Sequence, residues 1–384
     1  MPPDIPQLTP EEFLAGFPID LFLTLVGLTY LFGFAQNNGA IEVIVRWCVK
    51  LVGGRIGLMP WIFFALTAVL ISLGALFAVA IVAPLALSFA RRHRINQFMV
   101  GLLVVHGALA GAFSPISVYG IFINDYLTTS GLSPTPLTLF LAPFIFNTVF
   151  AVVVWFVLRR RPGLRADADD GLAEHESDGG TTIRLTRSQI PTLIGLIAMA
   201  LSVIIFSWDV GLVTITISVV LAAIDPAAGK AAMSKVSWSI VILICGVLTY
   251  IAVLQGAGTV EWVSAGISAI GVPLLAALLL FYMSGLISAL ASSLAIIGVV
   301  IALAVPFLES GDVHVGGFVA ALAIAATIVD ISPFSTNGAM LLANVHPSIR
   351  DRYYRQMIGY AGLMCLIGPG LAWVVAAVPT VTSG

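Results

Sequence analysis

Charged residues are scarce in this chain. Only 9% of its 384 residues are Asp, Glu, Lys or Arg, and 59% are hydrophobic, whereas soluble domains carry about 25% charged residues. So little charge cannot keep a large surface hydrated, so membrane lipid is the expected surrounding over most of the chain. The 17 basic and 19 acidic residues form no basic excess, and no nucleic-acid partner is expected.

Cysteine is also scarce. Cys48, Cys245 and Cys365 are isolated and lie in or beside apolar runs, so they predict free packed thiols rather than a disulfide framework or a metal site. Residues 1–17 contain no Lys or Arg. The start of the chain therefore lacks the basic region of a secretory signal peptide.

Long apolar runs are abundant, and a run of about 20 residues crosses a bilayer. Two stretches, 58–90 and 273–306, divide at a tip rich in Ser, Gly and Ala. Small residues let backbones approach closely, so both stretches predict re-entrant hairpins, with two ordinary spans in each as the alternative. The fold class expected is all-α integral membrane. The eight predicted spans are 18–36, 97–128, 137–158, 190–207, 209–225, 237–255, 316–344 and 353–378.

The basic residues decide between these alternatives. If both hairpins are re-entrant, all 17 Lys and Arg residues fall on one side of the membrane. The positive-inside rule then makes that side cytoplasmic, with both termini outside, in a multi-pass protein of the bacterial inner membrane. The polar segment 159–189 is predicted to be a cytoplasmic linker. Reading either hairpin as a single crossing would put basic residues on both sides.

The chain contains an internal repeat. Leu28-Thr29-Tyr30 recurs as Leu248-Thr249-Tyr250, and the segment 114–120 matches 332–338, at offsets between 216 and 220. Five crossings separate equivalent points, so the repeats are expected to be inverted, as in many secondary transporters. The predicted organisation is an external segment 1–17, repeat 1 over 18–158 (hairpin 58–90, broken helix 97–128), the linker 159–189, repeat 2 over 190–378 (hairpin 273–306, broken helix 316–344) and a tail 379–384. Repeat 1 lacks the two lead-in spans of repeat 2, through either loss or a truncated start.

Both repeats carry the pattern Ser-Pro-x-Ser-x-x-Gly inside an apolar span. Pro removes a backbone donor and Gly adds conformational freedom, so each pattern predicts a helix break whose polar groups bind ions or substrate. The alternatives are a Pro kink with back-bonding serines and, for the hairpin tips, simple packing. The candidate substrate-binding residues at breaks and tips are Ser72, Gly74, Ser114, Pro115, Ser117, Ser288, Ser292, Ser332, Pro333, Ser335, Thr336 and Asn337.

Two other polar residues lie within apolar spans. Asp330 is the one acid placed deep in a span, where a carboxylate costs about 2.5–3.5 kcal/mol to insert; it is expected to bind Na⁺, carry a proton or cap a helix. His106 is a candidate substrate contact or proton shuttle, or else a core histidine. No Lys or Arg is predicted at the midplane, so an anion would need a co-bound cation. The candidate Na⁺ ligands are Ser72, Ser114, Ser117, Ser288, Asp330, Ser332 and Ser335.

These motifs resemble a known family. The segment 12–30, His106-Gly107 and the segment 114–117 look like the malonate/dicarboxylate carrier family, and the segment 330–338 looks like its second half. That family belongs to the ion transporter superfamily, alongside divalent anion:sodium symporters. The resemblance implies a homodimer in which the transport domain of each protomer moves as an elevator and carries a small di- or tricarboxylate. The Ser-Asn-Thr tips of the sodium symporters are absent here, so sodium stoichiometry does not carry over.

The function expected is cation-coupled symport of a malonate-like dicarboxylate. A proton-coupled or exchange carrier for another organic anion is the main alternative. An intramembrane enzyme is disfavoured because the sequence has neither paired deep acids nor a Ser–His or HExxH motif, and a channel is a weaker option. The protein is therefore not expected to be an enzyme.

Overall fold

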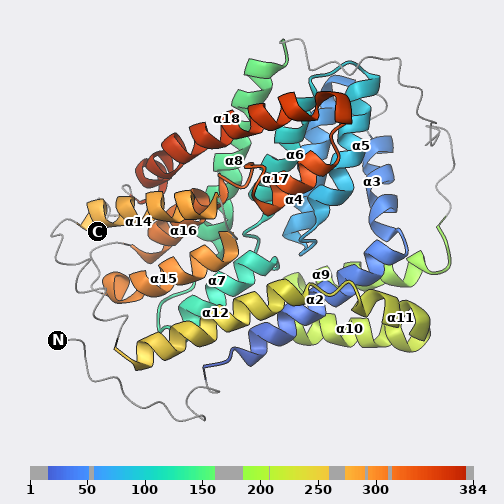
Figure 1. Ribbon diagram of the computed structural model, residues 1–384. Helices are drawn as coiled ribbons and strands as arrows, with labels where there is room; N and C mark the ends of the chain where they lie inside the picture. The colour runs from blue at the N-terminus through green and yellow to red at the C-terminus, as the bar shows by residue number, and fades with distance from the viewer. Residues whose placement is uncertain are drawn as a thin grey trace.

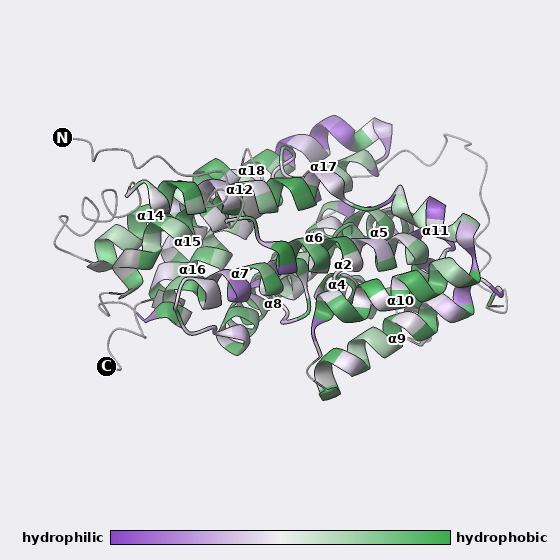
Figure 2. Ribbon diagram, turned by 90° about the horizontal axis from the view of Figure 1, so that it is seen from below, coloured by the Kyte–Doolittle hydropathy of each residue, from purple (hydrophilic) through white to green (hydrophobic). Residues whose placement is uncertain are grey.

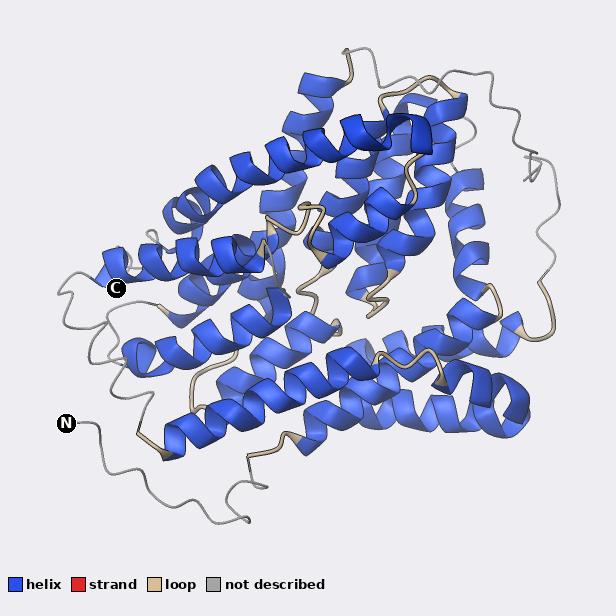
Figure 3. Ribbon diagram, in the orientation of Figure 1, coloured by secondary structure: helices blue, strands red, loops and turns tan. Residues whose placement is uncertain are grey.

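A computed structural model describes residues 16–51, 56–160, 185–206, 208–258, 273–289, 293–309 and 314–377. Every regular element in these ranges is helical (Figure 3), so the prediction of an all-α chain is confirmed for them. Most of the predicted N-terminal segment, most of the linker, the tail and Ser292 lie outside the described residues.

The first half contains one helix that the sequence interpretation missed. Its elements are α2 (Ile19–Asn37), α3 (Ala40–Leu51), the 3-10 turn η1 (Ile56–Leu58), α4 (Met59–Ser72), α5 (Ala78–Arg92), α6 (Gln97–Gly111), α7 (Val118–Thr129) and α8 (Pro136–Leu158). Helix α3 was not predicted, because a search for long apolar runs misses a helix with Glu42, Arg46 and Lys50 among its apolar residues.

The second half adds a further unpredicted element, the short helix α11. Its elements are α9 (Gln189–Phe206), α10 (Val210–Ile224), α11 (Pro226–Met233), α12 (Trp238–Gly256), α14 (Pro273–Ser288), α15 (Ser293–Glu309), α16 (Val315–Thr327), α17 (Thr336–Ala343), α18 (Pro347–Ala372) and the π turn η2 (Trp373–Ala377).

The helices have the composition of membrane spans. In the described ranges, three are long and apolar enough to cross a bilayer, or four if the bent pair α11–α12 is one span. Most of the others are apolar helices of 10–17 residues, shorter than the roughly 20 residues a single crossing needs. Figure 2 shows hydrophobic colouring along most helices. The number of eight spans stays a prediction.

All four stretches that were expected to be interrupted consist of two helices. The stretch 58–90 forms α4 and α5, 97–128 forms α6 and α7, 273–306 forms α14 and α15, and 316–344 forms α16 and α17. Helix α16 ends at Thr327, so Asp330 lies in the break itself and not within a helical span. Whether the hairpins re-enter the membrane stays a prediction.

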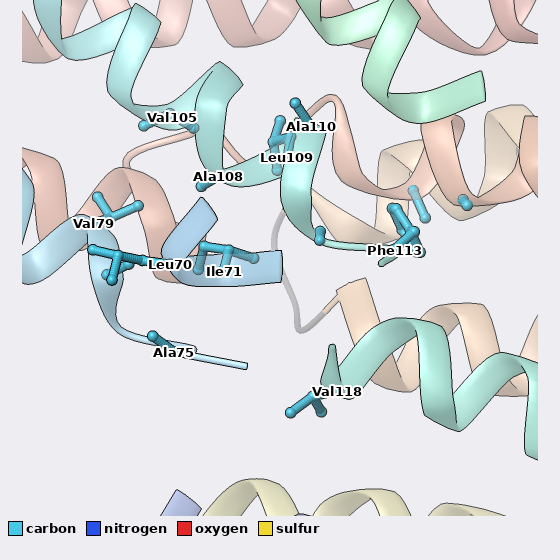
Figure 4. Packing of buried hydrophobic residues seen from close by; sticks show 14 of the residues in the cluster. Leu70, Ile71, Ala75, Val79, Val105, Ala108, Leu109, Ala110, Phe113 and Val118 are labelled. Carbon is cyan, nitrogen blue, oxygen red and sulfur yellow. The ribbon is translucent and has the colours of Figure 1, made fainter. Parts of the chain in front are cut away.

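The helices before the breaks form the centre of the fold. All residues of α6 are buried, and it packs against α4, α5 and α8, while α16 packs against α14, α18 and α8. A side chain at Gly107 or Gly111 would collide with the α4 carbonyls of Phe64 and Ala68, so α4 and α6 touch backbone to backbone. Figure 4 shows Leu70 and Ile71 of α4 beside Ala108 and Leu109 of α6.

The two halves interlock around this centre. Helix α17 of the second half packs against α5 of the first half, and Phe122 of α7 lies against Gly298 of α15. In each case the helix after one break contacts the second arm of the other half's helix pair. Helices α9, α10 and α11 form a separate group against α2 (Figure 1). Both breaks are thereby brought to the middle of the molecule.

Candidate functional site

The two helix breaks have the same hydrogen-bond pattern. Ser117 caps α7, because its Oγ accepts from the Gly120 N–H at 3.1 Å, and Ser335 caps α17, because its Oγ accepts from the Gly338 N–H at 3.3 Å. Each hydroxyl donates to the carbonyl five residues back, at 2.5 Å to Ala112 O and 2.7 Å to Asp330 O. Such caps satisfy groups that a broken helix leaves free.

The glycine that ends each pattern is required by close approach. A Cβ on Gly120 would collide with the carbonyl oxygen of Ser114, and a Cβ on Gly338 with that of Ser332. Neither glycine is among those with positive φ in the described ranges. The sequence interpretation attributed these glycines to conformational freedom, and that reason is wrong; each one lets the break fold back onto its own helix.

The first tip is tied to the first break. The Ser114 hydroxyl donates to the Ser72 carbonyl at 2.8 Å, and the Ser72 hydroxyl donates to the Gly111 carbonyl at 3.2 Å. Gly74 has a φ of 104° and lies against Leu28 of α2 rather than against the break. The hydroxyl groups that Ser72 and Ser114 were expected to offer to a ligand therefore donate hydrogen bonds that hold tip and break together.

The second tip is tied to its break through a carboxylate. The Ser288 hydroxyl donates to Ser293 Oγ at 2.8 Å, and the Ser293 hydroxyl donates to Asp330 Oδ1 at 2.5 Å. All three side chains are buried. Asp330 occupies the position that Ala112 has in the first break. The second break thus has a carboxyl group where the first has a methyl group.

A cavity of about 80 Å³ lies between the two breaks; by the same measure one water needs roughly 10–15 Å³, so a small ligand fits. Asp330, Thr336 and Asn337, all predicted site residues, line it together with Tyr119, which the sequence interpretation missed. Tyr119 is the repeat equivalent of Asn337, a relation that could have identified it. The other lining residues are Ile71, Leu76, Phe77, Ala108, Leu109, Ala112, Ile240 and Thr327.

The cavity contains one carboxylate and no basic side chain among its lining residues. Thr336 and Asn337, the first two residues of α17, line the cavity. The N-terminus of a helix carries roughly +0.5 charge. No group of three or more His, Cys, Asp or Glu residues that could hold a metal occurs in the described part of the chain. A Na⁺ ion here would depend on the Asp330 carboxylate together with hydroxyl and carbonyl oxygens, which are ligands suited to a hard cation.

The other predicted site residues that the structure describes are not among the residues lining the cavity. Ser332 accepts from the Phe334 N–H at 3.3 Å. Pro115 is exposed and Pro333 is buried. His106 is fully buried, with both ring nitrogens in hydrogen bonds, to Asn147 and to Tyr360. Its predicted contact with substrate would need a change in this arrangement.

Paired short helices around a small internal cavity are a construction of membrane carriers. Residues 4–112 match a family model described as "Dicarboxylate carrier protein MatC N-terminus". The resemblance seen in the motifs is thereby confirmed for this N-terminal part, which is less than a third of the chain. The family matched is one of carriers, in agreement with the expectation that the protein is not an enzyme.

The fold is similar to that of a solved transporter. The crystal structure of the YdaH transporter of Alcanivorax borkumensis has a TM-score of 0.64 and 13% sequence identity, over 94% of this chain and 86% of that chain. At this identity the likeness concerns the fold alone. A search of curated proteins finds no match.

Proposed function

We propose that this protein is a secondary active transporter that moves a small malonate-like dicarboxylate across the bacterial inner membrane by cation-coupled symport. The N-terminal match to a dicarboxylate carrier family supports the substrate class, and the likeness to a transporter fold supports the mode of action. By the family resemblance we further propose a homodimer of chains with two inverted repeats, in which the transport domain of each protomer carries both helix pairs and both breaks and moves as an elevator.

The observation that carries the coupling is the Asp330 carboxylate in a cavity without a basic lining residue. Two carboxylates about 4 Å apart repel by roughly 4 kcal/mol at an effective dielectric constant of about 20. A dicarboxylate therefore binds well only when a cation or a proton neutralises Asp330. Binding of the two ligands is then coupled, because each raises the affinity for the other.

The identity of the cation decides between symport with Na⁺ and the proton-coupled alternative. Na⁺ would be bound by Asp330 with the predicted serine and carbonyl oxygens of the two breaks. A proton would be bound by Asp330 alone, and the Ser293 hydroxyl that now donates to Oδ1 would stay as a partner of the neutral acid. Both forms present an uncharged site to the substrate.

The test is uptake of labelled malonate into proteoliposomes under an inward Na⁺ gradient and, separately, under an inward proton gradient. We expect uptake above the gradient-free level under one gradient, with loss in Asp330→Asn. Asp209→Asn is the matched control, because Asp209 is an exposed acid that caps α10 away from the cavity. No uptake of malonate or of other small dicarboxylates under either gradient would contradict the proposal, as would full coupled uptake by Asp330→Asn.

A further inference from the structure

A row of contacts joins α6 of the first half to α18 of the second. The Phe98 ring meets Tyr353 edge to face, with 5.3 Å between ring centroids, and also meets Tyr360 at 6.5 Å. A Cβ on Gly101 would collide with the Tyr353 hydroxyl. Tyr353 and Tyr360 are seven residues apart and so lie on one face of α18. We call this row the α6–α18 seam.

His106 contributes the shortest polar contact of the seam. Its Nε2 lies 2.7 Å from the Tyr360 hydroxyl, and its Nδ1 lies 2.9 Å from Asn147 Oδ1 on α8. The Asn147 amide nitrogen donates to the Pro143 carbonyl at 2.9 Å, so the amide oxygen faces the ring. In the neutral imidazole Nδ1 therefore carries the proton and donates to Asn147 Oδ1, and Nε2 accepts from the Tyr360 O–H.

This arrangement connects three helices at the back of the cavity wall. His106 is not a lining residue, but Ala108, Leu109 and Ala112, which follow it on α6 and in the first break, are. Asp330 lines the same cavity and belongs to the half that contributes Tyr360. A shift of α6 against α18 would therefore change the separation of the first-break wall from Asp330.

We propose that His106, as a neutral imidazole held between Asn147 and Tyr360, is a positioning residue. It fixes the distance between two parts of the cavity wall, the part formed by α6 and the first break and the part formed by the second break. It does so without touching substrate or carrying a proton. The inference rests on the proposed transport function, which defines what the cavity binds. The hydrogen bond to Tyr360 is the shortest polar contact of the α6–α18 seam between the two halves, so its loss should weaken substrate binding while the helices stay folded.

The test removes only that hydroxyl. Tyr360→Phe keeps the ring and should raise the KM for labelled malonate by about tenfold, because the two sides of the cavity are no longer held at the separation that bound substrate needs. The maximal rate and the pH profile of uptake should stay as in wild type, and the melting temperature should fall by only a few degrees, because the imidazole nitrogen is left unpaired. Tyr353→Phe is the matched control, because this buried tyrosine lies on the same seam but its hydroxyl makes only a 3.5 Å contact with the Gln97 carbonyl.

A second pair of variants tests the role of the ring. His106→Gln keeps both a donor and an acceptor and should retain more substrate affinity than His106→Leu, which keeps neither. A change in the pH profile in Tyr360→Phe or His106→Gln would overturn the proposal in favour of a proton-carrying role. Equal effects of Tyr360→Phe and Tyr353→Phe on KM, or loss of the folded protein in Tyr360→Phe, would also overturn it.

A readout without substrate separates this inference from the proposed function. In a background without the native cysteines, Ala112→Cys places a thiol in the cavity wall. Adding Tyr360→Phe should change its labelling rate severalfold, and adding Tyr353→Phe should not. If wild type transports no dicarboxylate but this labelling difference holds, the proposed function fails and the positioning role stands. An unchanged labelling rate would remove the positioning role whatever the substrate is.

Discussion

The first and second helix breaks have nearly the same backbone and differ in chemistry. Both end in a serine cap that donates to the carbonyl five residues back and a glycine pressed against a carbonyl oxygen. Only the second break has a carboxylate, Asp330, tied to its helix tip through Ser293; the first has Ala112 and a serine–backbone contact instead. The two breaks thus share a scaffold of serine caps and close glycine contacts, and the difference between Ala112 and Asp330 gives only the second break a carboxyl group.

Asp330→Asn should have the largest effect on transport. We expect it to lower gradient-driven uptake by about 100-fold or more, because a neutral amide still accepts from Ser293 but has no charge to balance a cation and no proton to exchange. The protein should stay folded, which a melting curve of the purified variant checks. Wild-type uptake rates in Asp330→Asn would show that the carboxyl group of the second break has no special role in transport.

Gly120→Ala and Gly338→Ala test what the breaks share. Both place a methyl group against a backbone carbonyl that cannot move away, so each should destabilise the fold by about 2–4 kcal/mol. The melting temperatures of the two variants should fall by similar amounts. A large fall in one and none in the other would show that the breaks are not equivalent in packing.

Ser335→Ala and Ser117→Ala sharpen the comparison further. Each removes a helix cap, which costs roughly 1–2 kcal/mol, so their effects on stability should match. Transport should be lost in Ser335→Ala, because the Ser335 hydroxyl also holds the Asp330 carbonyl at 2.7 Å, and should fall less in Ser117→Ala. Equal transport rates in the two variants would argue against a special role of the second break.

Tyr119→Phe should have the smallest effect. Tyr119 and its repeat equivalent Asn337 both line the cavity. We therefore expect the Tyr119 hydroxyl to affect the choice of ligand more than the stability of the fold. We expect uptake of malonate to fall by about threefold to tenfold, as for one lost hydrogen bond, with an altered preference among dicarboxylates. Competition of unlabelled dicarboxylates against labelled malonate measures that preference.

Local sequence signals predicted much of the fold. Apolar runs located most of the long helices, and small-residue tips and Ser-Pro patterns located the interruptions, because these depend on neighbouring residues alone. Helices α3 and α11 were missed since one is amphipathic and the other has eight residues. Neither matches the pattern of a membrane span.

The sequence by itself determined that the chain is helical and apolar, that it repeats, and that Asp330 is an unusual acid. The tertiary structure decided which side chains meet. Ser293 reaches Asp330 across 37 positions, and Tyr360 reaches His106 across 254. Such pairs depend on how α6, α16 and α18 pack, and packing is a property of whole helix surfaces that no local pattern encodes. For the same reason, only the folded chain shows that one cavity joins the two breaks.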